Sequence, residues 1–317
     1  MSDHNNKTHR QIITFNKDIG HSYVPNLNAR LIDDQGGYFI KTNSQGFRSD
    51  NEYLKKKSGR RILFFGDSNT AADGVCNQDR YSDLIGKYFK AEVFNFAISG
   101  TGTDQQYLTW EKYAKEVEAD LIVIGVLVEN IERNKVAYRE TISNLTKDKT
   151  LTAKPFFKIE NQKLILKNNH LKPFDGNFEK VNRNDVQWFI PESQRFLYKT
   201  INLLRKNVIY KKINNKYEMQ LSNLRSFLIQ RFYQPFKDYG NSESNGYLLL
   251  KKILEKFTNS IKNIPIILIP IPTYHYYFDG AKPIYKNLFQ SLHNPSKKVF
   301  LADPLSQLKK IKYKEKK

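Results

Sequence analysis

A serine, a glycine and an asparagine in this sequence are of the types that acyl transfer requires. Ser68 follows a Gly66-Asp67 turn, and a serine hydroxyl is a nucleophile that can form a covalent acyl intermediate. The tetrahedral intermediate of such a reaction carries an oxyanion, which hydrogen-bond donors stabilise. The backbone N–H groups of Ser68 and Gly100 and the side-chain amide of Asn130 are candidate donors. These residues therefore form a candidate catalytic set.

Each of these residues also has an ordinary structural explanation. Gly-Asp-Ser is a common turn sequence, in which Asp67 or Ser68 would cap the following helix. Gly100 would be a turn glycine, and Asn130 would be a helix cap. Catalysis is favoured only by their joint placement, because each of them follows a separate apolar segment.

The apolar segments predict buried strands at 62–66, 92–98 and 120–128. Helical patterns lie between them at 81–90 and 104–119. Strands that alternate with helices predict βαβ units and a parallel sheet. Because chemistry in such sheets gathers at the carboxyl ends of the strands, we expect the three residues at one edge. The first helical pattern places these side chains on one face: Tyr81, Leu84, Ile85 and Tyr88.

The strand and helix pattern defines the expected organisation of the chain. Residues 1–57 form an N-terminal extension, which we expect to be mobile up to about residue 20 and to contain a hairpin that starts at 38–40. Residues 58–317 form the main domain, in which 133–246 are an insertion of mixed helix and hairpin structure.

Within the insertion, residues 156–159 and 163–166 predict a hairpin, and 196–232 are helix-prone. Amphipathic helices there could contact a membrane surface, or pack against their own domain. After the insertion the pattern resumes with a helix at 247–259, a strand at 264–272, a helix at 284–292 and a last strand at 299–303.

The composition gives the chain a large positive charge. There are 52 Lys and Arg residues against 32 Asp and Glu, a formal charge of +20. Such a charge suits an acidic partner, or it is spread over a solvated, lysine-rich surface. No compact basic and aromatic motif accompanies the charge, so nucleic acid is not the expected partner.

Cysteine content and apolar runs indicate the compartment. Cys76 is the single cysteine, so an internal disulfide is excluded. The N-terminus has no apolar core of the signal-peptide type, and no run approaches the ~20 apolar residues of a membrane span. These features predict a cytoplasmic protein.

The motifs resemble those of the SGNH (GDSL) hydrolase superfamily. Residues 66–68 match its Gly-Asp-Ser motif, and 95–100 (Asn-Phe-Ala-Ile-Ser-Gly) match its second motif. Residues 128–130 (Val-Glu-Asn) stand where Gly-x-Asn-Asp is usual, so the neighbouring aspartate is missing. The resemblance covers 58–134 by motif and 247–305 by general architecture.

This resemblance implies a fold, a reaction and a site. The fold would be a three-layer α/β/α sandwich with a mostly parallel, flavodoxin-like sheet. Ser68 would be the nucleophile, and Gly100 and Asn130 would donate to the oxyanion. No metal or organic cofactor would be needed.

The general base is the open question. The family places Asp-x-x-His after the last strand, and without this histidine Ser68 would be a weak nucleophile. Here the last strand is followed by Asp303-Pro304-Leu305-Ser306, with no histidine after it. His275, which follows the 264–272 strand, is one candidate base. The other explanation is that the chain stops before the Asp-x-x-His segment.

Three functions follow from the sequence. The first is a serine esterase or O-acetyl transferase that acts on an acylated glycan or lipid through an acyl-enzyme on Ser68. The second is an inactive member that binds a glycan or lipid at the same place. The third, suggested by charge alone, is a nucleic-acid-binding protein on a hydrolase-like scaffold. Composition and spacing leave the acyl group, the alcohol and the oligomeric state open.

Overall fold

The computed structural model describes residues 6–7, 12–32, 37–142, 149–168, 186–187, 234–278 and 280–311. The strands of this part are β1 (Asn6–Lys7), β2 (Ile13–Asn16), β3 (Gly20–Tyr23), β4 (Asn28–Leu31), β5 (Tyr38–Lys41), β6 (Arg61–Phe65), β7 (Glu92–Asn95), β8 (Leu121–Leu127), β9 (Tyr138–Ile142), β10 (Lys149–Ala153), β11 (Phe156–Glu160), β12 (Lys163–Lys167), β13 (Val186–Gln187), β14 (Ile266–Ile271) and β15 (Val299–Leu301). The helices are α1 (Ser68–Ala71), α2 (Tyr81–Phe89), α3 (Thr103–Thr109), α4 (Asn130–Arg133), α7 (Asn245–Ser260), α8 (Tyr274–Tyr277), α9 (Lys286–Leu292) and α10 (Leu305–Leu308).

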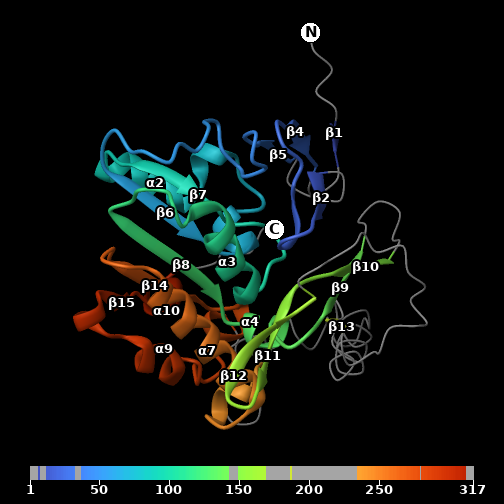
Figure 1. Ribbon diagram of the computed structural model, residues 1–317, viewed down its shortest axis with the longest axis vertical. Helices are drawn as coiled ribbons and strands as arrows, with labels where there is room; N and C mark the ends of the chain where they lie inside the picture. The colour runs from blue at the N-terminus through green and yellow to red at the C-terminus, as the bar shows by residue number, and fades with distance from the viewer. Residues whose placement is uncertain are drawn as a thin grey trace, which may run out of the picture.

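The largest sheet of the described residues is parallel and has the order β15-β14-β8-β6-β7 (Figure 1). The first of these strands in the chain, β6, lies between the second, β7, and the third, β8. This is the flavodoxin-like order, and the strand order reverses between β6 and β8. Ligands of such folds bind at this switch point, outside the carboxyl ends of the strands.

Helices cover both faces of the sheet, so the molecule has the three α/β/α layers that the family resemblance implies (Figure 1). Alternate residues of β6 point to opposite faces, as in any strand. Phe65 packs with Trp110 and α7 on one face, while Phe64 packs with Tyr81 and Ile85 of α2 on the other. Residues 62–66 are all buried, as the apolar run predicts, and so is Arg61 at the start of β6.

An aromatic cluster joins the sheet to the layer of α3 and α7. The ring of Phe65 stacks on Phe96 at a centroid distance of 5.4 Å. It also meets Phe257 of α7 edge to face at 5.5 Å and Trp110, which follows α3, at 5.9 Å. Aromatic pairs of this kind stabilise a core beyond the burial of their surface.

The predicted apolar face of α2 is wrong in part. Tyr81 and Ile85 pack on the sheet, but Leu84 and Tyr88 are 53% and 81% exposed. The helix approaches β7 through Gly86, where an added Cβ would lie 2.3 Å from Cγ2 of Val93. A glycine at the point of closest contact rotates the helix so that the two larger side chains face solvent.

The predicted strand at 92–98 is shorter than expected. It ends at Asn95, whose side-chain Oδ1 accepts a hydrogen bond from the backbone N–H of Ala97 at 3.0 Å. This local bond turns the chain, as asparagine side chains commonly do. The last strand likewise ends at Leu301 instead of residue 303, and the helix predicted at 104–119 is α3 followed by a π-helical turn over Trp110–Ala114.

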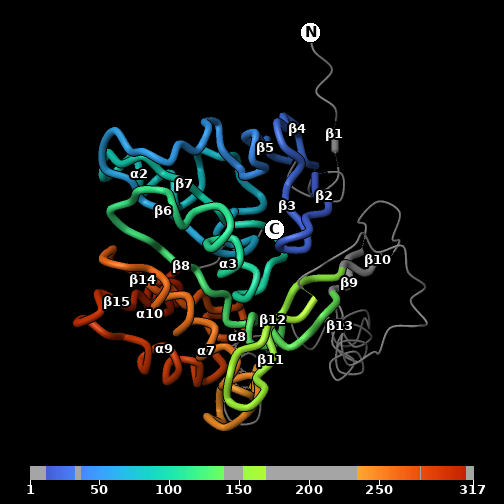
Figure 2. Tube along the Cα trace, in the orientation of Figure 1, coloured from blue at the N-terminus to red at the C-terminus, as the bar shows by residue number. Residues whose placement is uncertain are grey.

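The N-terminal extension is ordered where it is described. The prediction that it is mobile up to about residue 20 is wrong for residues 12–20, because β2 pairs with β3 and Ile12 and Ile19 are buried. β5 forms its hairpin with β4, which precedes it. The extension lies beside α3 (Figure 2), where Gln105 Nε2 donates to the carbonyl of Ile19 at 2.7 Å.

The described part of the insertion contains two hairpins. β11 and β12 form the predicted antiparallel hairpin, and β9 and β10 form a second one. Lys154, between β10 and β11, forms a buried ion pair with Asp104 in the first turn of α3. The helix-prone residues 196–232 lie outside the described residues.

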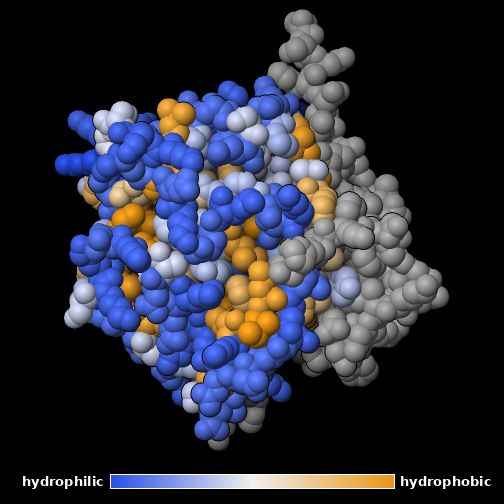
Figure 3. Space-filling view, viewed as in Figure 1, coloured by the Kyte–Doolittle hydropathy of each residue, from blue (hydrophilic) through white to orange (hydrophobic). Residues whose placement is uncertain are grey.

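The surface seen in Figure 3 is mainly hydrophilic, with an apolar patch over α7 and β12. Leu248 of α7 and Ile165 of β12 are exposed apolar side chains of these two elements. Within the described ranges, no helix has the length and apolar character needed to cross a membrane.

Candidate active site

The loops after β6, β7 and β8 carry the three predicted residues and lie side by side. β6 pairs with β7 on one edge and with β8 on the other. Neighbouring strands are about 4.8 Å apart, so all three loops leave the sheet within two strand spacings. Ser68, Gly100 and Asn130 therefore belong to adjacent loops at the switch point.

The turn after β6 depends on Gly66 and Asp67. A Cβ on Gly66 would lie 2.1 Å from Oγ1 of Thr70, so the close packing of α1 on the strand requires glycine here. Asp67 caps α1, because its Oδ1 accepts a hydrogen bond from the backbone N–H of Asn69 at 3.0 Å. The capping explanation thus holds for Asp67. Ser68 becomes the first residue of α1 and is partly exposed.

The turn after β7 is hydrogen-bonded to Gly66 as well. The backbone N–H of Ile98 and the hydroxyl of Thr101 both lie 3.3 Å from the carbonyl oxygen of Gly66. Gly100, between them, has φ +85°, a left-handed conformation that favours glycine. The turn that contains Gly100 therefore lies against the turn that leads to Ser68.

Asn130 reaches across to the loop after β7. It is the first residue of α4, which Glu129 precedes at the capping position, so the prediction of a helix cap is wrong. Its Nδ2 donates to Oγ1 of Thr103 at 3.3 Å, and its side chain is fully buried. Within the described residues its Oδ1 has no hydrogen-bond partner. The bond to Thr103 uses one of the two amide hydrogens.

Arg133 links all three loops. Its guanidinium lies 3.6 Å from Oδ2 of Asp67, donates to the carbonyl of Thr101 at 3.3 Å, and contacts Oε1 of Glu129 at 3.2 Å. Asp67 is fully buried, and this burial raises the pKa of its carboxyl group, an effect that the positive charge of Arg133 opposes. Arg133 thus compensates a buried carboxylate next to Ser68.

Asp73 makes a second link between the first two loops. Its backbone N–H donates to the carbonyl of Ser68 at 3.0 Å. Its Oδ2 accepts a hydrogen bond from the hydroxyl of Ser99 at 2.7 Å. One residue therefore connects the backbone of Ser68 with the residue that precedes Gly100.

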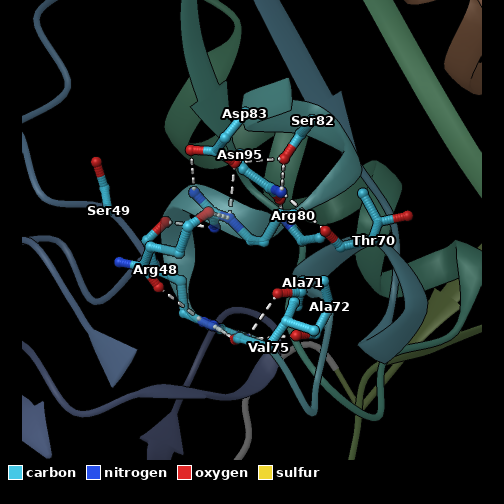
Figure 4. A network of polar contacts seen from close by, with 12 residues as sticks. Arg48, Ser49, Thr70, Ala71, Ala72, Val75, Arg80, Ser82, Asp83 and Asn95 are labelled. Atoms are coloured by element: carbon cyan, nitrogen blue, oxygen red, sulfur yellow. Dashed lines mark hydrogen bonds and ion pairs between the residues drawn. The ribbon is translucent and has the colours of Figure 1, made fainter. Parts of the chain in front are cut away.

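The C-terminal end of the Ser68 helix is held by a buried arginine of the N-terminal extension (Figure 4). Arg48 Nη1 donates to the carbonyls of Ala71 and Ala72 at 2.7 and 3.0 Å, and its Nη2 donates to that of Val75 at 2.8 Å. Arg80 Nη1 in turn donates to the carbonyl of Arg48 at 2.7 Å. A cation at the carbonyl end of a helix is favourable. The extension therefore helps to place α1.

No described histidine lies at Ser68. Within the described part of the chain, the Ser68 hydroxyl makes no hydrogen bond. His275 is in α8, after β14, and its ring is tilted by 38° against the ring of Tyr274 at a centroid distance of 3.9 Å. β8 lies between β14 and β6 in the sheet, so the segment that carries His275 and the loop that carries Ser68 do not follow neighbouring strands. His21 contacts the carbonyl of Ser99. His293 lies near the amino end of β15, and its ring is 6.3 Å from the ring of Phe300.

Metal ligands do not gather at this edge. Among the described residues no group of three or more His, Cys, Asp or Glu side chains could hold a metal ion. The donors present are a hydroxyl, backbone N–H groups, an amide and one guanidinium. Such a set can bind an oxyanion without a metal.

Several contributors escaped the sequence analysis: Arg133, Arg48, His21 and Tyr23. Their contacts are mostly with backbone carbonyls of distant loops, and no spacing in the sequence marks such contacts. Arg133 alone had a signal, because it lies three residues after Asn130, one helical turn along the same short helix.

No model of a protein family matches the chain, and no curated protein matches it. Among solved structures, the chain is similar to an acetyl xylan esterase from the rumen bacterium Butyrivibrio proteoclasticus, with 10% sequence identity and a TM-score of 0.30. The match covers 84% of this chain and 57% of that one, so the chain spans little more than half the length of the esterase structure.

Proposed function

We propose that the protein is a serine-dependent ester hydrolase or O-acyl transferase of the SGNH type. The observation that carries the proposal is the convergence of three loops at the switch point, with Ser68 between the loops of Gly100 and Asn130 and with Arg133 in contact with all three. The substrate class would be an acylated carbohydrate or lipid. The positive charge of the chain would attract such a substrate if the substrate is acidic.

The roles follow from the chemistry of the groups. Ser68 Oγ attacks the ester carbonyl, the alcohol leaves, and an acyl-enzyme remains, which water or a second alcohol then resolves. The N–H groups of Ser68 and Gly100 and the second amide hydrogen of Asn130 stabilise the oxyanion. Each such donor is worth about 10²–10³ in rate. A serine hydroxyl without a general base is a weak nucleophile, so turnover depends on the group that accepts the Ser68 proton.

The test uses p-nitrophenyl acetate and a fluorophosphonate probe. Wild-type protein should release p-nitrophenol slowly and should be labelled covalently, and Ser68→Ala should abolish both. Added imidazole should accelerate the wild type beyond its effect on Ser68→Ala, because an external base can accept the serine proton. Equal rates and equal labelling of the two proteins would rule the proposal out.

An inactive ligand-binding protein is the second candidate. The buried Asn130 amide, which is already bonded to Thr103, favours it. In that case an acylated oligosaccharide or a fatty acid should bind saturably, while the fluorophosphonate leaves Ser68 unlabelled.

A further inference from the structure

Ser99, the residue before Gly100, is held at three points. Its backbone N–H donates to the hydroxyl of Tyr23 at 3.0 Å. Its carbonyl oxygen lies 2.8 Å from Nε2 of His21. Its hydroxyl donates to Asp73 at 2.7 Å. His21 and Tyr23 both come from β3, so the N-terminal extension fixes this residue of the loop.

The contact of His21 has one chemical interpretation. A carbonyl oxygen can only accept a hydrogen bond, so Nε2 of His21 must carry the hydrogen and donate it. His21 and Ser99 are both buried, so water competes little for this bond. A short bond of this kind orients the carbonyl that accepts it.

Orienting the Ser99 carbonyl also orients the N–H of Gly100. The two groups belong to one planar peptide unit, and none of the described peptide bonds is cis. In a trans peptide the carbonyl and the N–H point in opposite directions. With the carbonyl directed at β3, the Gly100 N–H points away from the extension.

This peptide needs an external constraint. Glycine adopts positive and negative φ with similar ease, so the unit before Gly100 can rotate at little cost. A rotated peptide would present a carbonyl oxygen where an oxyanion should bind. Misplacement of a catalytic group by ~1 Å can cost about 10² in rate.

We propose that His21 is a positioning residue, which holds the Ser99–Gly100 peptide so that the Gly100 N–H donates to the oxyanion. The inference rests on the proposed function, and it assigns His21 no contact with substrate. Hydrogen bonding at the carbonyl also polarises the peptide and strengthens its N–H as a donor, by about 10–30%.

A spectroscopic test isolates this peptide. The chain contains two Ser-Gly pairs, Ser58-Gly59 and Ser99-Gly100. Labelling with carbonyl-¹³C serine and ¹⁵N glycine therefore gives two carbonyl–amide cross-peaks, and the exposed Ser58-Gly59 pair is an internal reference. His21→Leu removes the donor, whereas His21→Gln keeps an N–H near the position of Nε2. Exposed His293→Leu is the matched control.

We expect the Ser99–Gly100 peak to shift or broaden in His21→Leu, to return towards its wild-type position in His21→Gln, and to stay unchanged in His293→Leu. With p-nitrophenyl acetate, kcat of His21→Leu should fall by about 10- to 10²-fold with KM nearly unchanged, and His21→Gln should recover most of it.

The outcomes separate the two proposals. If wild type and Ser68→Ala have equal rates, the proposed function fails, while the spectrum still decides whether His21 holds the peptide. An unchanged Ser99–Gly100 peak in His21→Leu overturns the positioning role. So does a shifted peak with wild-type kcat, or a fall in kcat that His21→Gln does not reverse.

Discussion

At the scale of single residues, Arg133 has the most direct physical role among the described residues of the site. It is almost completely buried, and it is the cation that faces the fully buried carboxylate of Asp67. A buried carboxylate without a partner is costly, so the turn that presents Ser68 depends on a residue 66 positions later in the chain. Hydrogen bonds to Thr101 and Glu129 fix the guanidinium in turn.

Arg133→Met should lower the free energy of unfolding by about 3–5 kcal/mol near neutral pH, because it leaves the Asp67 charge buried and unpaired. Burial raises the folded pKa of Asp67 above its ordinary value of 3.8. The folded state then holds the proton more tightly than the unfolded state, so stability falls as pH rises through the folded pKa. Removing Arg133 raises that pKa further.

The measurement is urea unfolding at about pH 4.5 and about pH 7.5, where the variant should lose more stability than the wild type between the two conditions. Asp67→Asn combined with Arg133→Met should remove the excess loss, since no charge remains to be buried. A deficit of equal size at both pH values would contradict the assignment.

Residue types were enough to predict Ser68, Gly100 and Asn130 as candidates, and the structure places their loops side by side. Their catalytic roles stay predictions. Arg133, Arg48 and His21 could not be predicted in the same way. Most of their partners are backbone carbonyl groups, which every residue carries, and they become neighbours only when the chain folds.

At the scale of elements, a buried ion pair joins the described part of the insertion to α3, in addition to the ring contact between Phe157 and Tyr107. Lys154 and Asp104 are both almost inaccessible to solvent, and Asp104 lies next to Thr103, which accepts the hydrogen bond of Asn130. Burial raises the pKa of Asp104, and the ammonium group of Lys154 opposes this shift.

Lys154→Met should therefore lower the free energy of unfolding by about 3–5 kcal/mol, because it breaks a buried pair and leaves one charge behind. Asp104→Asn together with Lys154→Met should recover most of this loss. Lys163→Met, at an exposed lysine of β12, is the matched control and should change stability by less than about 0.5 kcal/mol. A loss from Lys154→Met no larger than that of the control would show that the ion pair does not anchor the insertion.

Elements were predicted well where burial on both faces makes a continuous apolar run. β6 and β8 are such strands. β14 is half-buried on one face but has the same apolar run, and the β11–β12 hairpin follows from its turn residues. The errors arise from local or tertiary packing. The side chain of Asn95 ends β7 by a local hydrogen bond, and close packing at Gly86 sets the rotation of α2. In the polar N-terminal segment, the burial of Ile12 and Ile19 holds residues 12–20 in place.

At the scale of the whole molecule, the N-terminal extension and the sheet share their interior. The extension supplies Arg48 to the end of α1 and Tyr23 and His21 to the loop of Gly100. The aromatic cluster around Phe65 then joins the sheet to α3 and α7. A division of the chain at residue 57 remains a sequence-based prediction, and these contacts suggest that the two parts unfold together.

Cooperative unfolding can be tested with Trp110, which lies in the aromatic cluster, since Trp188→Phe leaves it as the single tryptophan. In this background Arg48→Met should lower the urea midpoint of Trp110 fluorescence and of far-UV circular dichroism by the same amount. The reason is that fully buried Arg48 donates to four acceptors, all of which lose their partner. Lys41→Met, at an exposed extension lysine, should leave both midpoints in place.

If Arg48→Met instead produced a separate early transition in circular dichroism while the Trp110 midpoint stayed fixed, the extension would be an independent unit. The Gly100 loop and α1 would then keep their positions without it.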